Sequence, residues 1–224
     1  MRYWYLIPVC LAVTVVFLIV ERQKKPVPAV CLKGLASAVF VVFGWLGSRG
    51  CSDTVFVNRG LAGLTLGCVA DVLLDLRFVF PEKKSFFFLL GTVVFLSGHV
   101  LYLIALLPKC ANLTVCLIVS ALLIAAAVVL IGIRLKTPPV FRVFGTVYIS
   151  TIMTMVSVAG GIFLAAPAAS SGIYFAGAVL FLISDLILIF NTFGGKPAYP
   201  RRIANLEIYY IGQLLIGLSL QFVK

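Results

Sequence analysis

The sequence predicts an all-α membrane protein, folded as a bundle of eight transmembrane helices. Two features of composition support this: 62% of the 224 residues are hydrophobic and only 11% are charged. Soluble domains are about half apolar, with about a quarter of their residues charged. The third feature is that the apolar residues form long runs joined by short polar connections. We therefore expect a single polytopic domain over residues 1–224, with no separate soluble domain.

Eight runs approach the length of a membrane-crossing helix, which needs about 20 mostly apolar residues. The first run lacks the small-residue cleavage site of a secretory signal, so we expect it to be a retained span. No long polar segment interrupts the series, which favours one compact bundle. The predicted spans are residues 3–20, 30–48, 59–76, 85–107, 111–133, 140–164, 171–192 and 203–223.

Basic residues gather in the odd-numbered connections, which hold 13 of the 18 Lys and Arg residues. Cytoplasmic loops carry such an excess, so we expect these connections to face the cytoplasm and both termini to face the other side. This clustering also explains the net charge of +11 without a nucleic-acid partner. The expected location is a bacterial plasma membrane or a eukaryotic endomembrane, as a multi-pass protein.

Asp71 and Asp185 are the acidic residues predicted to lie deepest in the membrane. They lie about 18 Å and about 21 Å from the outer ends of the third and seventh spans, at 1.5 Å per residue. A carboxylate inside a span is expensive and by default marks a functional site. Both are candidate catalytic residues; the alternative for Asp71 is a structural carboxylate satisfied by a partner. Asp75 lies nearer the interface, where a solvated or loop-paired role is expected as readily.

His99 is the only histidine and is expected near the middle of the fourth span. It shares a helix face with Tyr102, three residues later. It is a candidate catalytic residue, and a structural core histidine is the alternative. A three-histidine zinc site is impossible with one histidine, and no spacing demands another metal. We therefore expect no metal and no cofactor.

A polar stripe runs down the eighth span, where Asn205, Tyr209 and Gln213 recur at four-residue steps and share one helix face. Such a face suits the wall of a cavity; hydrogen bonding between helices is the alternative. In the seventh span, Ser184 and Asn191 lie on nearly the same face. These side chains are candidates for contact with a substrate.

The two halves of the chain echo each other. His99 lies 28 residues after Asp71, Gln213 lies 28 residues after Asp185, and a glycine precedes both later residues. Two parallel four-helix halves would produce this spacing, and repeats of this kind occur in membrane folds. Because few positions match, coincidence is the alternative.

Several short motifs also occur in an order and spacing typical of one family. They are Gly67-x-x-x-Asp71, His99-x-x-Tyr102, Gly177-Ala178-x-Leu180-Phe181-x-x-Ser184-Asp185, Asn191-x-Phe193 and Tyr209-Tyr210-x-x-Gln213-Leu214, with an early lysine at Lys33. In these residues the chain resembles the YhhN/TMEM86 family of integral membrane lysoplasmalogenases. One departure is Ala70, where the family usually has glycine.

The resemblance implies hydrolysis of the vinyl ether bond of lysoplasmalogens, giving a fatty aldehyde and glycerophospho-ethanolamine or -choline. A vinyl ether is protonated at carbon, and water traps the resulting oxocarbenium ion, so the slow step needs a proton donor and an anion. Asp71 and Asp185 would divide these roles within one water-holding cavity. His99 would tune one of them or position water. The partners would be a lysophospholipid substrate and membrane lipids.

The same resemblance assigns roles in substrate binding. Hydroxyl and amide groups of Tyr102, Tyr209 and Gln213 would orient water or the glycerol oxygens. Basic residues on the cytoplasmic side would hold the phosphate, although Lys33 is expected as readily to snorkel to the interface. The predicted substrate-binding residues are Lys33, Tyr102, Ser184, Asn191, Arg201, Tyr209 and Gln213.

Two other functions are consistent with the sequence. Intramembrane Asp and His residues also form proton relays, so a proton-coupled transporter of a small molecule or lipid is one alternative. No span is clearly interrupted by Gly-Pro at its middle, which weighs against it. The other alternative is a catalytically silent family member. Head-group preference and oligomeric state stay open.

Overall fold

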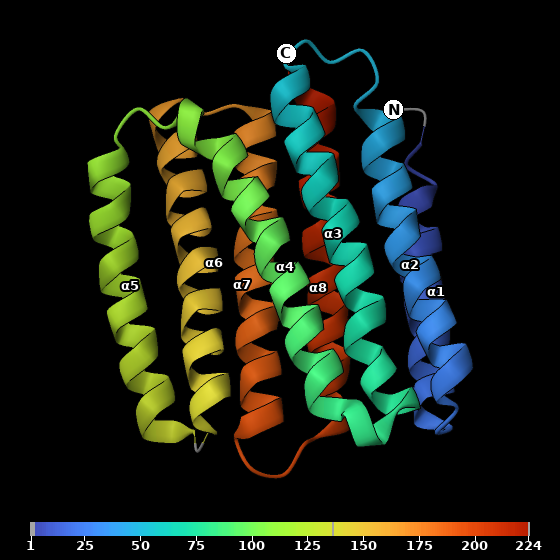
Figure 1. Ribbon diagram of the computed structural model, residues 1–224. Coiled ribbons are helices and arrows are strands. Elements are labelled where there is room, and N and C mark those ends of the chain that lie inside the picture. The colour runs from blue at the N-terminus through green and yellow to red at the C-terminus, as the bar shows by residue number, and fades with distance from the viewer. Residues whose placement is uncertain (1–2, 136, 224) are drawn as a thin grey trace.

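The computed structural model describes residues 3–135 and 137–223, which form eight α-helices and three short 3-10 segments. In Figure 1 the helices stand side by side, and both termini lie at the same end. The helices are α1 (Leu6–Arg22), α2 (Pro26–Gly47), α3 (Thr54–Val79), α4 (Lys84–Leu106), α5 (Leu113–Arg134), α6 (Pro139–Ala165), α7 (Ala169–Phe193) and α8 (Tyr199–Ser219), and the 3-10 segments are η1 (Pro81–Lys83), η2 (Leu107–Lys109) and η3 (Leu220–Phe222).

Six of these helices, all except α1 and α3, are long and apolar enough to cross a membrane. The prediction of a multi-pass, all-α membrane protein is therefore confirmed. By length and composition, however, only six of the eight described helices qualify as membrane spans. Helix α1 has only 17 residues. Helix α3 has 26 residues, but Arg59, Asp71, Asp75 and Arg77 reduce its apolar character.

Helix α3 begins five residues before the predicted span because Asp53 caps it. The Asp53 carboxylate accepts a 2.9 Å hydrogen bond from the backbone N–H of Phe56, which satisfies an end group of the helix. Lys109, from η2, donates a 2.6 Å hydrogen bond to the same carboxylate. The hydrogen bond from Lys109, followed by that from Phe56, holds the pKa of Asp53 below its ordinary value. This ion pair ties the start of α3 to the end of α4.

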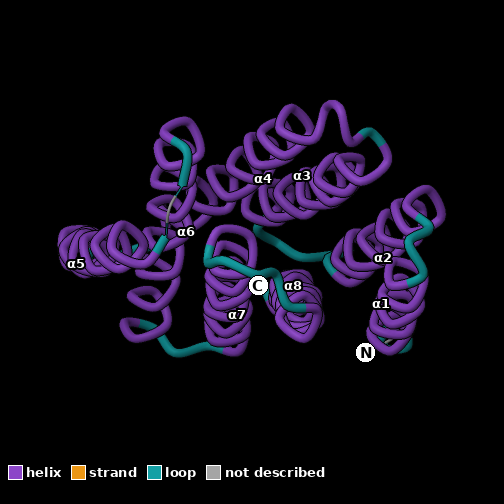
Figure 2. The backbone as a smooth tube through the Cα atoms, turned by 90° about the horizontal axis from the view of Figure 1, so that it is seen from below, coloured by secondary structure: helices purple, strands orange, loops and turns teal. Residues whose placement is uncertain are grey.

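The helices pack in a pattern that occurs twice. Helix α1 packs on α2, α2 on α3 and α3 on α4, and the same order runs from α5 to α8. The halves meet where α2 packs on α8 and α4 packs on α6. Seen from the end, α3, α4, α7 and α8 lie at the centre, with α1 and α5 at opposite edges (Figure 2). The central helices carry most of the candidate residues.

Two pairs of glycines allow the central helices to approach closely. A Cβ atom on Gly177 would lie 2.8 Å from the carbonyl oxygen of Gly212, and one on Gly98 would lie 3.2 Å from the carbonyl oxygen of Gly63. Gly177 and Gly212 each lie 114 positions after Gly63 and Gly98. Helices α3 and α4 therefore cross as α7 and α8 do, with the same small residues at the contact.

Candidate active site

Asp71 lies inside the bundle, only 2% exposed, and does not face lipid. One carboxylate oxygen accepts hydrogen bonds of 2.6 Å from Ser37 Oγ on α2 and 2.6 Å from Tyr209 Oη on α8. The other oxygen lies 3.3 Å from Lys33 Nζ. An adjacent cation and two donors all favour the ionised carboxylate.

Lys33 and Asp75 extend this charge cluster toward the end of the bundle that carries the α1–α2 loop. Lys33, only 3% exposed, lies 3.2 Å from Asp75 as well as 3.3 Å from Asp71. Asp75 also pairs with Arg202 at 3.3 Å, and Arg202 pairs with Glu21 at 2.8 Å. The expectations of a snorkelling Lys33 and of a solvated Asp75 are therefore corrected, because α2 packs on α3 with both groups turned inward. The alternative of a loop partner for Asp75 is met by Arg202, which the predicted spans leave in the connection before the eighth. The phosphate contact of Lys33 stays a prediction.

Arg201, which the sequence predicts beside the phosphate of a substrate, lies outside this cluster. Its side chain is exposed and donates to the backbone carbonyl of Lys196 at 3.2 Å. Its neighbour Arg202 makes the buried contacts instead. Adjacent helical residues point about 100° apart at 3.6 residues per turn, so only one of the two arginines can face the bundle interior.

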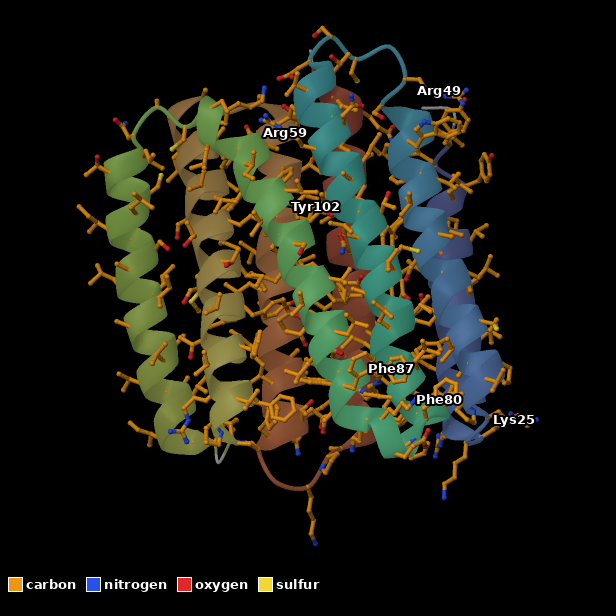
Figure 3. All side chains as sticks on the ribbon, viewed as in Figure 1. Lys25, Arg49, Arg59, Phe80, Phe87 and Tyr102 are labelled. Carbon is orange, nitrogen blue, oxygen red and sulfur yellow. The ribbon has the colours of Figure 1, made fainter. Side chains whose placement is uncertain are left out.

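The polar stripe of α8 forms a hydrogen-bonded chain that starts at Asp71. Tyr209 donates to Asp71, and Gln213 Nε2 donates to Tyr209 Oη at 3.3 Å. Tyr102, whose place on α4 Figure 3 shows, donates to Gln213 Oε1 at 3.2 Å. The structure thus brings together Asp71, Tyr102, Tyr209 and Gln213, which the sequence had proposed as neighbours of a common site.

Asp185 lies in different surroundings from Asp71. It is 4% exposed and accepts a 2.8 Å hydrogen bond from Tyr148 Oη on α6. Across residues 3–135 and 137–223, no cation lies within ion-pair distance of it. Asp185 lines a cavity of about 70 Å³ between α4, α6 and α7, whose wall is otherwise largely apolar and aromatic.

Asp71 is not among the residues that line this cavity, so the expectation of two acids in one open cavity is not met. Aromatic rings separate them. Phe95 lines the cavity, and its ring centroid lies 5.9 Å from that of Tyr209, the partner of Asp71. The structure therefore places Asp185 at the cavity and Asp71 behind an aromatic wall.

Three phenylalanines meet at the end of the cavity nearest the loops. Phe88 on α4, Phe141 on α6 and Phe193 on α7 have ring centroids 5.5 to 6.3 Å apart. All three line the cavity. We call them the phenylalanine triad; it holds together the ends of three helices.

His99 is fully buried and forms no hydrogen bond with either aspartate. Its Nδ1 lies 2.8 Å from the backbone carbonyl of Phe95, and its Nε2 has no partner in the part of the chain that the structure describes. Its ring packs against Phe181 at 4.5 Å and Tyr148 at 5.6 Å between centroids. Its position beside Tyr148 connects it indirectly to Asp185.

Ser184 and Asn191 make contacts that stabilise the fold. Asn205 Nδ2 donates to both Ser184 Oγ and the Ser184 carbonyl, each at 2.8 Å, which joins α8 to α7. Asn191 accepts a 2.8 Å hydrogen bond from the backbone N–H of Ala198 and so shapes the α7–α8 loop. Neither residue lines the cavity of Asp185. Among the described residues, no group of three His, Cys, Asp or Glu side chains could hold a metal ion.

Four residues of the site described above were not singled out from the sequence: Glu21, Ser37, Tyr148 and Arg202. Tyr148 lies 37 residues before Asp185, much as Lys33 lies 38 residues before Asp71. The echo between the halves could therefore have pointed to Tyr148. For Ser37 and Arg202 no comparable signal exists, because each depends on the rotation of one helix against another.

The sequence profile of the YhhN family matches residues 25–220. The match covers helices α2 to α8 and every residue of the site except Glu21. No curated protein and no solved structure matches the chain. Since the match extends over most of its length, the chain belongs to the YhhN family.

Proposed function

We propose that this protein is a membrane-embedded hydrolase that cleaves the vinyl ether bond of lysoplasmalogens. The observation that carries the proposal is the contrast between two buried acids. Asp71 has a cation and two donors around it, whereas Asp185 has a hydroxyl group and an apolar cavity. Of two carboxyl groups in such unlike environments, one can stay ionised while the other serves as the acid. Membership of the YhhN family is consistent with this activity.

Asp185 is the proton donor in this proposal. A carboxyl group in apolar surroundings, with no cation beside it, is most stable as the neutral acid. Tyr148 occupies one oxygen of Asp185, which leaves the other to carry the proton. Transfer of this proton to the vinyl carbon that is not bonded to the ether oxygen produces an oxocarbenium ion. Water then adds to the cationic carbon as its proton returns to Asp185, and the hemiacetal breaks into aldehyde and alcohol.

Asp71 stabilises the oxocarbenium ion by its charge, without touching it. Lys33, Ser37 and Tyr209 favour the ionised form of its carboxyl group. Charges interact strongly across an apolar interior, and fixed charges aimed at a developing charge are a large source of catalysis. His99 packs against Tyr148 and so positions the hydroxyl group that holds Asp185.

We further propose that all eight helices cross the bilayer as two parallel four-helix halves, with the basic end in the cytoplasm. The repeated packing order and the two glycine pairs support the halves. The low hydropathy of α3 does not oppose crossing, because Asp71 and Asp75 face the bundle and are paired there. Lys25 lies at the proposed cytoplasmic end, and Arg49 and Arg59 lie at the other (Figure 3).

The test is release of fatty aldehyde by the purified protein. It is offered a lysoplasmalogen and, separately, the lysophospholipid ester with the same head group. We expect the wild-type protein to release aldehyde from the vinyl ether. Asp185→Asn should lower the rate at least about a hundredfold, because general acids contribute on the order of 10²–10⁴. Glu82→Gln, which changes an exposed acid after the end of α3, should keep full activity. An inactive wild-type protein, or an active Asp185→Asn variant, would contradict the proposal.

One observation favours a second function, a proton-coupled transporter. A continuous chain of charged groups runs from near the bundle end to its interior through Glu21, Arg202, Asp75, Lys33 and Asp71. Such chains serve as proton relays. This function predicts proton movement with substrate uptake in sealed vesicles and no aldehyde.

A further inference from the structure

Arg77, in the last turn of α3, is a largely buried cation that forms no ion pair within 4 Å with another described residue. Its side chain makes no hydrogen bond or ion pair with any other described residue, and its Nε is buried without a partner. The residue is 9% exposed. Its guanidinium carbon lies 4.7 Å from the ring centroid of Phe78 and 5.2 Å from that of Phe88. Burial of an unpaired charge is costly, so a ligand that supplies negative charge would complete this site.

The guanidinium group lies next to the cavity of Asp185. Phe88 forms part of the cavity wall, and its ring centroid lies 5.2 Å from the guanidinium carbon of Arg77. Leu74 also lines the cavity. Arg77 follows Leu74 by three residues, so it lies on the same face of α3 and about 4.5 Å nearer the loop end at 1.5 Å per residue. A ligand in the cavity could therefore reach Arg77 at the basic end of the bundle.

The other basic residues near the site are already occupied. Lys33 is bound by Asp71 and Asp75, and Arg202 is bound by Glu21 and Asp75. The sequence predicts Lys33 and Arg201 as the basic residues that hold the phosphate. In the structure Lys33 is paired with two carboxylates, and Arg201 is exposed outside the cluster. Arg77 retains its hydrogen-bonding capacity.

We propose that Arg77 binds the phosphate of a lysophospholipid, at a subsite beside the cavity of Asp185. A guanidinium group presents donors in a planar fork that matches two phosphate oxygens. In the proposed complex one lipid spans from Asp185 to Arg77, with the three glycerol carbons between its sn-1 ether oxygen and its phosphate ester oxygen. The identity of the reacting bond rests on the function proposed above, but the phosphate contact does not require hydrolysis.

The test is a binding measurement with lipids that cannot be hydrolysed. The probes are a 1-O-alkyl lysophospholipid and the matching 1-O-alkylglycerol, which lacks phosphate, titrated into protein held in a neutral detergent. In Arg77→Gln we expect about tenfold or greater weakening of binding for the lysophospholipid, and no change for the alkylglycerol. Arg77→Lys keeps the charge but loses the fork, so its affinity should be intermediate. Arg134→Gln, an exposed arginine at the end of α5, should bind as the wild type does.

Several results would overturn the proposal. They are failure of the wild-type protein to bind the lysophospholipid, unchanged binding in Arg77→Gln, and equal losses for both probes, which would indicate a structural role. Inorganic phosphate is added as a competitor: displacement of the lipid at micromolar concentration would show that the subsite serves free phosphate instead. If Arg77→Gln does not fold, Arg77→Lys decides the question. Weaker binding of the lysophospholipid with unchanged binding of the alkylglycerol would support the subsite, and unchanged binding of both would contradict it.

The two proposals fail separately. Binding that depends on Arg77, without aldehyde release from a lysoplasmalogen, removes the proposed hydrolysis and keeps the subsite. Aldehyde release that Arg77→Gln leaves unchanged for both the lysoplasmalogen and a 1-O-alkenylglycerol removes the subsite and keeps the hydrolase.

Discussion

At Lys33, one ammonium group balances two buried carboxylates. Lys33→Met removes that charge, which leaves Asp71 without a cation and Asp75 paired with Arg202 alone. We expect a loss of about 3–5 kcal/mol in the free energy of unfolding, as when one partner of a buried ion pair is deleted. Thermal unfolding in detergent measures it. Adding Asp71→Asn to Lys33→Met should recover part of the loss; a double variant that is less stable than the single one would contradict the pairing.

Asp53 makes a pH-dependent contribution to the stability of the fold at the start of α3. Asp53→Ala removes a helix cap and should cost about 1 kcal/mol. Because its folded pKa lies below the ordinary 3.8, the stabilisation is complete above that value and is lost as the pH falls through the lower folded value. The difference in unfolding midpoint between wild type and variant should thus be present at pH 7 and shrink below about pH 4. Equal differences at both pH values would contradict this.

The sequence was informative about the residues of the site where one helix presents them. Tyr209 and Gln213 share a face of α8 by spacing alone, and the structure joins both to Asp71. It was uninformative where a contact depends on how two distant helices rotate against each other. The placement of Arg202 rather than Arg201 beside Asp75, and of Tyr148 beside Asp185, was fixed by such rotation.

Among the elements, the pairs α3–α4 and α7–α8 depend most on close backbone contact. A Cβ on Gly177 would meet the backbone of Gly212 and, at 3.0 Å, that of Ile216, and backbone atoms cannot move aside as a flexible side chain can. Gly177→Ala should therefore cost about 1–3 kcal/mol. At Gly132 a Cβ would meet nothing within 4 Å, so Gly132→Ala should be neutral or stabilising by up to about 1 kcal/mol. Unfolding midpoints compare the two variants, and equal effects would contradict close packing at Gly177.

The existence of eight helices could be predicted from the apolar runs, because each run is long and the connections are short. Their ends could not be placed as well. Helix α3 starts at Thr54 because Asp53 caps it, and its last turn includes the charged Arg77. A hydropathy pattern registers neither a cap nor a charge that the bundle interior accepts, which is also why α3 has the length of a span without the composition of one.

For the whole molecule, the proposed crossing of α3 can be tested with cysteine reporters on either side of it. Ser52→Cys and Glu82→Cys both lie at exposed positions. With a membrane-impermeant maleimide on intact cells, we expect Ser52→Cys to react and Glu82→Cys to react only after permeabilisation, each above the background of the native cysteines. Equal reaction at both positions would mean that α3 does not cross, and the reverse order would invert the assigned orientation.

The small size of the cavity lined by the phenylalanine triad has a consequence for the speed of turnover. Its volume of about 70 Å³ is far below the roughly 300–1,000 Å³ of sites that enclose ligands of drug size, so a long-chain lipid must part α4, α6 and α7 to occupy it. Motions of packed helices against surrounding acyl chains slow down when those chains freeze. In nanodiscs of saturated lipid, the hydrolysis rate should therefore fall abruptly below the melting temperature of the bilayer, whereas unsaturated lipid should give a smooth temperature dependence. The fluidity of the host membrane would then set the rate of hydrolysis.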